Sequence, residues 1–139
     1  MTTRRAYVQP QAGNQGFART RKVIGALSLP IATTDLSPVG NIVAAFFVPK
    51  DFVTTGITMT APSLAASGLT INIGDAVVGN RFVNASAIGV AGGTVSAFAA
   101  GGQYYQFPVD TEILLTFNGA VTPAAGTITN FLIEGFVGP

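Results

Sequence analysis

The 139-residue sequence contains no cysteine, no histidine and no tryptophan. The absence of cysteine excludes disulfides and thiolate metal sites, so packing must hold the fold together. The absence of histidine removes the commonest general base and the commonest neutral metal ligand. These absences argue strongly against an enzyme, and we expect no catalytic residue, no metal site and no cofactor.

Charged residues are also scarce, at 9% of the chain against about 25% in an average globular domain. Apolar residues make up 48%, and the length suits one domain with one core. A surface with so few charges is typical of a protein that buries much of itself against partners. The simpler alternative is an ordinary β-domain covered in threonine and serine.

The few charges are distributed unevenly along the chain. Residues 1–22 hold five of the seven cations and no acid, whereas the remainder holds two cations and all six acids. The two parts therefore carry +5 and −4, which add up to the net charge of +1. A basic arm on a mildly acidic body predicts an electrostatic contact. We divide the chain into an extended arm, residues 1–22, and a β-domain, residues 23–139.

The arm is rich in Gln and Gly without any period, which predicts little structure in the isolated chain. We expect it to dock on a neighbouring subunit or an acidic shell through Arg4, Arg5, Tyr7, Phe17, Arg19, Arg21 and Lys22. The alternative is a tail that only aids solubility. Five cations could also contact phosphates, but the arm lacks the cation density and interleaved aromatics that favour nucleic acid.

Two long uncharged stretches, residues 52–74 and 82–109, raise the question of a membrane span. Thr, Gly, Pro and Ser are too frequent in them for a spanning helix, and the first alternates as a strand does. The N-terminus has arginines but no apolar core of a signal peptide. We therefore expect a soluble protein with no membrane partner.

Short alternating runs bounded by Gly, Pro, Asn or Asp predict an antiparallel β-fold, and no helical period appears. The run at 42–48 is apolar on both faces, so we expect it to be covered on both sides. Asn118-Gly119 is a strong turn signal and predicts that the last two strands form a hairpin. We expect a turn at 33–38, a loop at 61–68, and strands at residues 22–30, 40–48, 53–59, 69–73, 111–117 and 127–137.

Two pairs of charged residues are candidates for a site. Asp75 and Arg81 flank a short link, which a carboxylate and a guanidinium can clamp, and such a pair is structural far more often than catalytic. Asp110 and Glu112 lie two apart and so share one strand face. Paired carboxylates can hydrolyse glycosides, but a solvated strand edge is the favoured interpretation here.

The order of several short motifs in the second half resembles small virion proteins of tailed bacteriophages, of the head decoration (capsid cement) type. The motifs are Ile73-Gly74-Asp75, Asn80-Arg81-Phe82, Gly101-Gly102-Gln103-Tyr104-Tyr105, Asp110-Thr111-Glu112-Ile113 and Thr122-Pro123-Ala124-Ala125-Gly126-Thr127. The resemblance covers about residues 40–137 and leaves the arm outside. It implies a jelly-roll-like β-sandwich without catalytic residues.

The same resemblance implies a homotrimer on the outer surface of a capsid, assembled in the host cytoplasm, with the major capsid protein as partner. An N-terminal arm or a sheet edge would bridge capsomers. Two alternatives stay open. In one, a tail or fibre module binds host surface glycans through Tyr104 and Tyr105. In the other, the chain is the major coat protein of a small virus, with the arm on nucleic acid.

Overall fold

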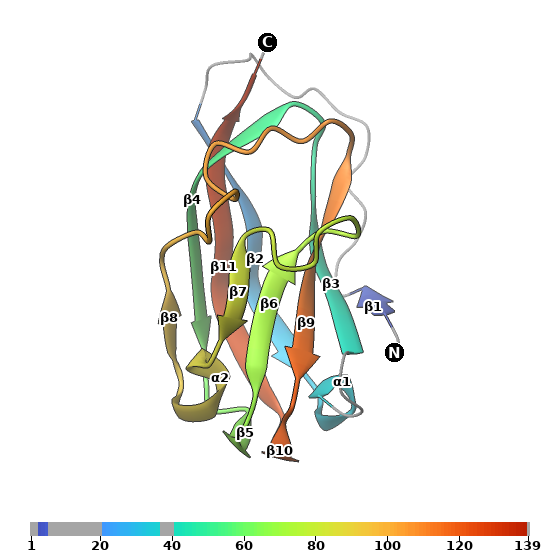
Figure 1. Ribbon diagram of the computed structural model, residues 1–139, viewed down its shortest axis with the longest axis vertical. Coiled ribbons are helices and arrows are strands. Elements are labelled where there is room, and N and C mark those ends of the chain that lie inside the picture. The colour runs from blue at the N-terminus through green and yellow to red at the C-terminus, as the bar shows by residue number, and fades with distance from the viewer. Residues whose placement is uncertain (1–2, 6–20, 37–40, 139) are drawn as a thin grey trace.

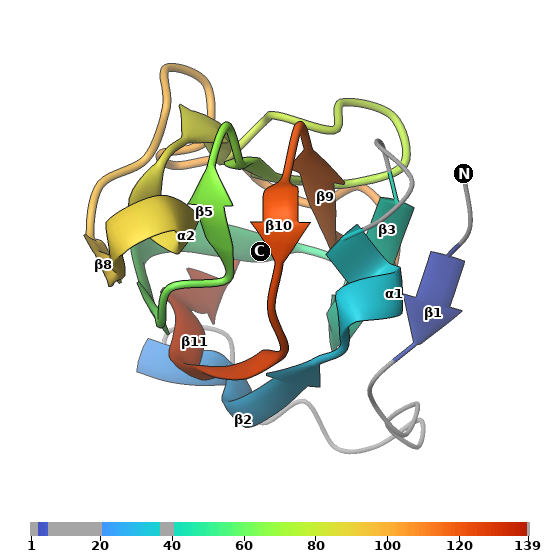
Figure 2. The same cartoon turned by 90° about the horizontal axis from the view of Figure 1, so that it is seen from below.

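The computed structural model describes residues 3–5, 21–36 and 41–138, and within them two β-sheets pack face to face (Figures 1 and 2). The larger sheet has the order β1 (Thr3–Arg5), β3 (Asn41–Val48), β9 (Thr111–Asn118), β6 (Thr70–Gly74), β7 (Val83–Ser86). The smaller sheet has the order β2 (Arg21–Ile31), β11 (Gly126–Val137), β4 (Phe52–Ala61), β8 (Gly93–Val95). The predicted all-β sandwich is confirmed, and the jelly-roll-like connectivity stays a prediction.

Two short helices and a two-stranded sheet lie at the lower end of the sandwich in Figure 1. The small sheet pairs β5 (Ala65–Ser67) with β10 (Val121–Pro123). The helices are α1 (Thr33–Leu36) and α2 (Ile88–Ala91). The expected turn at 33–38 thus contains a helical turn, and the expected loop at 61–68 contains a short strand.

The core lies between the two large sheets and follows the alternation of the sequence. On β9, Ile113, Leu115 and Phe117 are buried, while the residues between them are half-buried. Phe46 of β3 meets Phe131 of β11 across the interface, edge to face, with ring centroids 4.9 Å apart. Such aromatic contacts add to the area that the two sheets bury. The sandwich is therefore held by side chains that each strand presents at every second position.

Strand β3 is buried on both faces, as its doubly apolar pattern predicts. Residues 43–46 are all at most 4% exposed. A register shift between Ala44 and Phe46 against β9 interrupts the simple alternation. Such a bulge places two residues of one strand opposite one of the other. The strand nearest the N-terminal segment is therefore also one of the most enclosed.

The predicted hairpin of the last two long strands is wrong. Strand β9 pairs with β3 and β6 in the larger sheet, whereas β11 pairs with β2 and β4 in the smaller one. The turn signal itself is real, because Gly119 has a φ of +76°, which favours glycine. However, Val121–Pro123 then pairs with β5, so the chain leaves one layer and enters the other. A turn motif predicts that the chain bends, but it does not say which strand it meets next.

Candidate functional site

The first candidate region lies at the outer edge of the larger sheet, where β1 runs parallel to β3 (Figure 1). Thr3 lies opposite Ile42, Arg4 opposite Val43 and Arg5 opposite Ala44. The other strand pairings among the described residues are antiparallel. The N-terminal residues therefore add a short strand to a sheet that is otherwise built from the body of the chain.

A fork of hydrogen bonds fixes Arg4 on the body. Its Nε donates to Asp35 Oδ1 at 2.9 Å, and its Nη2 donates to Asp35 Oδ2 at 2.8 Å and to the Pro30 carbonyl at 3.0 Å. A bidentate guanidinium–carboxylate pair is strong and directional. The Asp35 side chain is only 8% exposed, whereas that of Arg4 is 44% exposed. The contact therefore joins a nearly buried carboxylate of the body to a guanidinium that is half exposed to solvent.

The environment of Asp35 favours its ionised form. Burial by itself would raise the pKa of the carboxyl, but hydrogen bonds from Arg4 and from the Ala32 N–H, together with the Arg4 charge, lower it overall. The Ala32 N–H donates to Asp35 Oδ2 at 2.8 Å. The same contact with Asp35 raises the pKa of Arg4, so this guanidinium stays charged. The pair is therefore a fully charged contact at neutral pH.

The second candidate region is the link between Asp75 and Arg81. Asp75 Oδ1 accepts from the N–H groups of Val77 and Val78 at 2.9 and 2.8 Å, and Arg81 Nε donates to Oδ2 at 2.6 Å. The Asp75 and Arg81 side chains are 4% and 17% exposed. Both oxygens of Asp75 are thus occupied by the link that it closes. The structure brings the two residues together as a clamp in which both carboxylate oxygens of Asp75 hold structural hydrogen bonds.

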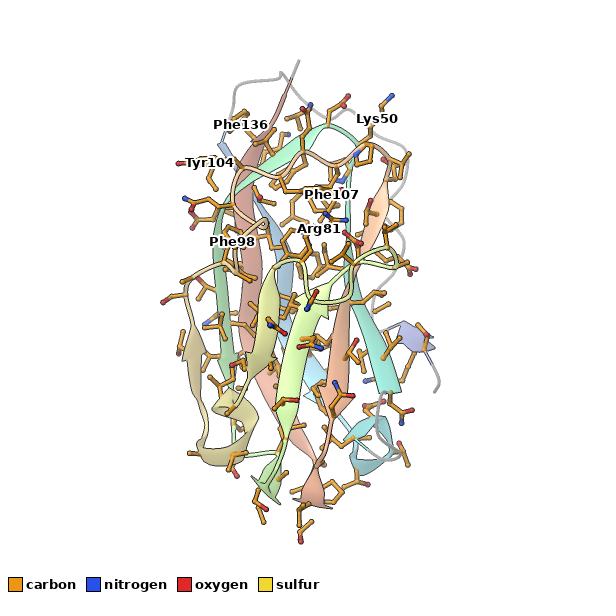
Figure 3. All side chains as sticks on the ribbon, viewed as in Figure 1. Lys50, Arg81, Phe98, Tyr104, Phe107 and Phe136 are labelled. Carbon is orange, nitrogen blue, oxygen red and sulfur yellow. The ribbon has the colours of Figure 1, made fainter. Side chains whose placement is uncertain are left out.

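An aromatic cluster lies beneath Arg81 and supports the clamp. The Arg81 guanidinium carbon lies 4.0 Å from the ring centroid of Tyr105, which is the geometry of a cation–π contact. The Tyr105 ring meets Phe107 edge to face at 5.0 Å, and Phe82 lies 5.7 Å from Phe107. Figure 3 shows Arg81 and Phe107 in the same upper part of the molecule. Phe107 therefore enters the core, and Tyr105 packs against the clamp.

The buried hydroxyl of Thr54 ties the aromatic segment to β4. The Tyr105 N–H donates to Thr54 Oγ1 at 3.0 Å, the hydroxyl donates to the Gly102 carbonyl, and the Tyr104 N–H donates to the Thr54 carbonyl at 2.7 Å. Tyr104 itself is 69% exposed and points outward (Figure 3). The two tyrosines therefore do not form one stacking platform, which disfavours the glycan alternative.

A pocket of about 500 Å³ opens beside the clamp. Its lining combines three carboxylate residues with apolar ones, among them Asp75, Asp110, Glu112, Val77, Tyr105 and Val109. Asp110 accepts the Lys50 N–H at 2.8 Å, so one of its oxygens fixes a turn. Within residues 3–5, 21–36 and 41–138, no three acidic side chains are grouped to hold a metal ion. The pocket offers a shaped acidic surface and shows no arrangement of a base with a nucleophile.

The predicted docking residues of the arm are only partly described. Tyr7, Phe17 and Arg19 lie outside the described residues. Arg5 belongs to β1, and Arg21 and Lys22 begin β2, so these three lie on strands at the margins of the two sheets. Their role in docking stays a prediction. No helix in the part of the chain that the structure describes has the length and apolarity to cross a membrane.

The partner of Arg4 could not be found by reading the sequence. Asp35 stands in a segment that reads as a turn, and the pair joins residues 31 positions apart. The only signal was general, a lone acid close to the start of a body whose arm is basic. Thr54 gave no signal, because in the sequence it is one of several threonines on a strand.

The sequence matches no protein-family model and no curated protein. Its fold is similar to that of two solved chains. One, in the structure described as the capsid of Ralstonia phage GP4, has a TM-score of 0.75 and 22% sequence identity, over 96% of this chain and 92% of that chain. The other, in the capsid asymmetric unit of cyanophage Pam1, has a TM-score of 0.68 and 24% identity, over 95% of both chains. The whole sandwich, and not a fragment of it, is therefore a fold that occurs in phage capsid structures.

Proposed function

We propose that the protein is a virion structural protein of a tailed phage, namely a decoration (cement) protein that binds the outer surface of the head. The observation that carries this proposal is the similarity of nearly the entire chain to chains of two phage capsid structures. The resemblance of the second half to decoration proteins supports the finer assignment. No enzymatic role is proposed, because Asp35 and Asp75 pair with arginines and Asp110 accepts a backbone N–H, and no base stands beside a nucleophile in the described pocket.

The surface supports adhesion. Large apolar side chains stand exposed on β2, on the 75–81 link and before β9, with Leu27 at 71%, Val77 at 85% and Val109 at 61%. Few charges surround them, since charged residues are 9% of the chain. Many weak contacts of this kind add up when the copies are linked or arrayed on a shell. Binding to the assembled shell then stabilises it by mass action.

We assign the contact with the major capsid protein to the arm, in a homotrimer assembled in the host cytoplasm. Arg4 is held by Asp35. The proposed contacts therefore fall on Arg5, Arg19, Arg21 and Lys22, with Tyr7 and Phe17 as anchors. Complementary charges on a cationic arm and an acidic shell raise the rate of association and fix the position in which the arm binds.

Binding to shells that lack the protein tests the assignment. We expect a variant with Arg5, Arg19, Arg21 and Lys22 all changed to Gln to bind at least roughly tenfold more weakly in a co-sedimentation assay. Lys50→Gln, which removes one exposed cation of the body, is the matched control and should bind as the unchanged protein does. Equal binding of the quadruple variant would contradict the arm's role. Failure of the unchanged protein to bind shells would contradict decoration itself.

A major coat protein is the second candidate, because the descriptions of the two similar structures name capsids without separating coat from decoration. A coat protein and a decoration protein differ in whether the purified chain assembles without another protein. A coat protein assembles closed shells, whereas a decoration protein needs a shell that already exists. Electron microscopy of the concentrated, purified chain separates them, since shells formed without another protein would favour the coat.

A further inference from the structure

The place that β1 occupies is a preformed slot on the body. We define the β1 slot as the outer edge of β3 at residues 42–44, the Asp35 carboxylate and the Pro30 carbonyl. The slot holds a strand in parallel register and binds its central arginine through three hydrogen bonds. It therefore recognises a short extended segment with an arginine at its centre.

The body builds this slot without help from β1. The Asp35 carboxylate is positioned by the Ala32 N–H at 2.8 Å, and the Asp35 N–H donates to the Ala32 carbonyl at 3.0 Å. The Asn41 side chain donates to the Thr34 carbonyl at 2.8 Å and so ties α1 to the start of β3. On its other side β3 is paired with β9 along its length. The acceptor groups therefore stand in place whichever chain supplies the strand.

The strand in the slot is joined to the body only through residues 6–20. At about 3.3–3.6 Å per residue, a chain of this length can span roughly 50 Å. For comparison, a folded domain of 139 residues has a radius of gyration of only about 14 Å. A strand that docks on its own body makes the same contacts on an identical neighbour. Exchange therefore alters only which copy supplies the strand, and the contacts of the strand stay the same.

We propose that the β1 slot is a docking site between copies of this chain, and that in the oligomer it holds Thr3–Arg5 of a second copy. Each exchanged strand is held by the register with β3 and by Arg4 on Asp35. High local concentration, as on a shell, favours exchange over return to the same body. Strand exchange between copies is distinct from the proposed attachment to the capsid, and it can be tested with the purified protein alone.

The absence of cysteine makes a direct test possible, because introduced cysteines have no competitors. Thr3 and Ile42 lie opposite each other in the register. Neighbouring strands bring such Cα atoms within the roughly 4.4–6.8 Å that a disulfide needs. Thr3→Cys and Ile42→Cys are made in separate proteins, of which one carries a mass tag. The two are mixed at high concentration, oxidised gently and analysed without reductant.

We expect tagged–untagged heterodimers at a yield at least roughly fivefold above a matched control, since a disulfide requires sustained proximity. The control replaces Ile42→Cys by Ser96→Cys, an exposed position directly after β8. Strands β8 and β1 lie on opposite sides of the molecule in Figure 1. Adding Arg4→Ala to the Thr3→Cys protein should lower the yield severalfold. This loss would show that the arginine contact, and not chance collision, carries the exchange.

A yield no higher than that of the Ser96→Cys control would overturn the proposal. So would a chain carrying both Thr3→Cys and Ile42→Cys that closes its disulfide only within one molecule at every concentration. The outcome is independent of capsid binding. Strand exchange without shell binding would contradict only the decoration role, and shell binding without exchange would contradict only this inference.

Discussion

Two aspartate–arginine pairs differ in geometry and in role: Arg4 binds Asp35 through two nitrogens, and Arg81 binds Asp75 through Nε. Arg81 and Asp75 are six positions apart and close a local link, whereas Arg4 and Asp35 are 31 positions apart and attach a strand from outside. The first pair is nearly buried, with side chains 4% and 17% exposed, while Arg4 of the second is 44% exposed. Arg4 makes the wider set of hydrogen bonds, but Asp75 supports more of the surrounding backbone.

From this contrast we expect the number of hydrogen bonds in an ion pair to be a poor measure of its contribution to stability. Both carboxylates are nearly buried, but Arg4 is half exposed and can exchange its partner for water at little cost, whereas Arg81 is mostly buried and Asp75 also accepts from two backbone N–H groups. The packing around Asp75 and Arg81 adds to the difference between the two pairs. A Cβ added to Gly74 would collide with the Val78 carbonyl, so the link lies directly on β6. The Asp75–Arg81 pair stabilises the folded body, whereas the Arg4–Asp35 pair attaches β1 to it reversibly.

The largest effect is expected for Asp75→Ala. The change leaves the Val77 and Val78 N–H groups and the Arg81 guanidinium without their acceptor in a mostly buried place. We expect the free energy of unfolding to fall by about 3 kcal/mol, measured by urea denaturation. Asp110→Ala is the matched control beside the same pocket and should cost about 1 kcal/mol or less, because Asp110 is exposed. Equal losses in both variants would remove the distinction between a buried clamp and a surface acid.

A smaller effect on global stability is expected for Arg4→Ala. Since this side chain is half in solvent, its loss should cost about 1 kcal/mol or less. Amide hydrogen exchange should nevertheless become faster for the β3 groups that face β1, while the amides of β9 stay protected. Exchange mass spectrometry of the two strands checks this. Unchanged protection of β3 would mean that β1 stays attached without its arginine.

The smallest effect is a dependence on pH that belongs to Asp35. Its folded pKa lies below the unfolded value of about 3.9, so its contribution to stability is present above that value. The contribution is lost as the pH falls through the folded pKa. We expect the unchanged protein to have a higher Tm than Asp35→Asn at neutral pH, and the difference to shrink below about pH 3.9. A difference that stays constant down to strongly acidic pH would exclude Asp35 as the titrating group.

The strands could be read from the sequence because their signals are local. The expected strands at 22–30 and 111–117 match β2 and β9 to within one residue at each end. Alternation along a strand reports which side chains meet the core, and turn residues report where it ends. The clamp of Asp75 and Arg81 was equally readable, since both residues flank one short link.

The pairing of distant segments could not be read in this way. The layer change between β9 and β11 depends on where Val121–Pro123 finds a partner, which is strand β5 far earlier in the chain. The pairing of Arg4 with Asp35 depends on a parallel strand that brings the chain's start to the far end of β2. Excess charge in the arm predicted an electrostatic contact with a neighbouring subunit or an acidic shell, but charge carries no information on position. The sequence therefore did not predict that Arg4 pairs with Asp35 of the same chain, and docking of the arm on a partner stays a prediction.

The brevity of β1 has a consequence for how the protein behaves in concentrated solution. An open flank of a sheet can template the addition of strand after strand and so seed filaments. Here three residues, two of them arginines, cover residues 42–44 of that flank with a strand too short to extend the growth. We expect this cover to help a charge-poor chain stay dispersed at high density. Samples clipped at their first residues should fail by forming fibres, long before the sandwich itself melts.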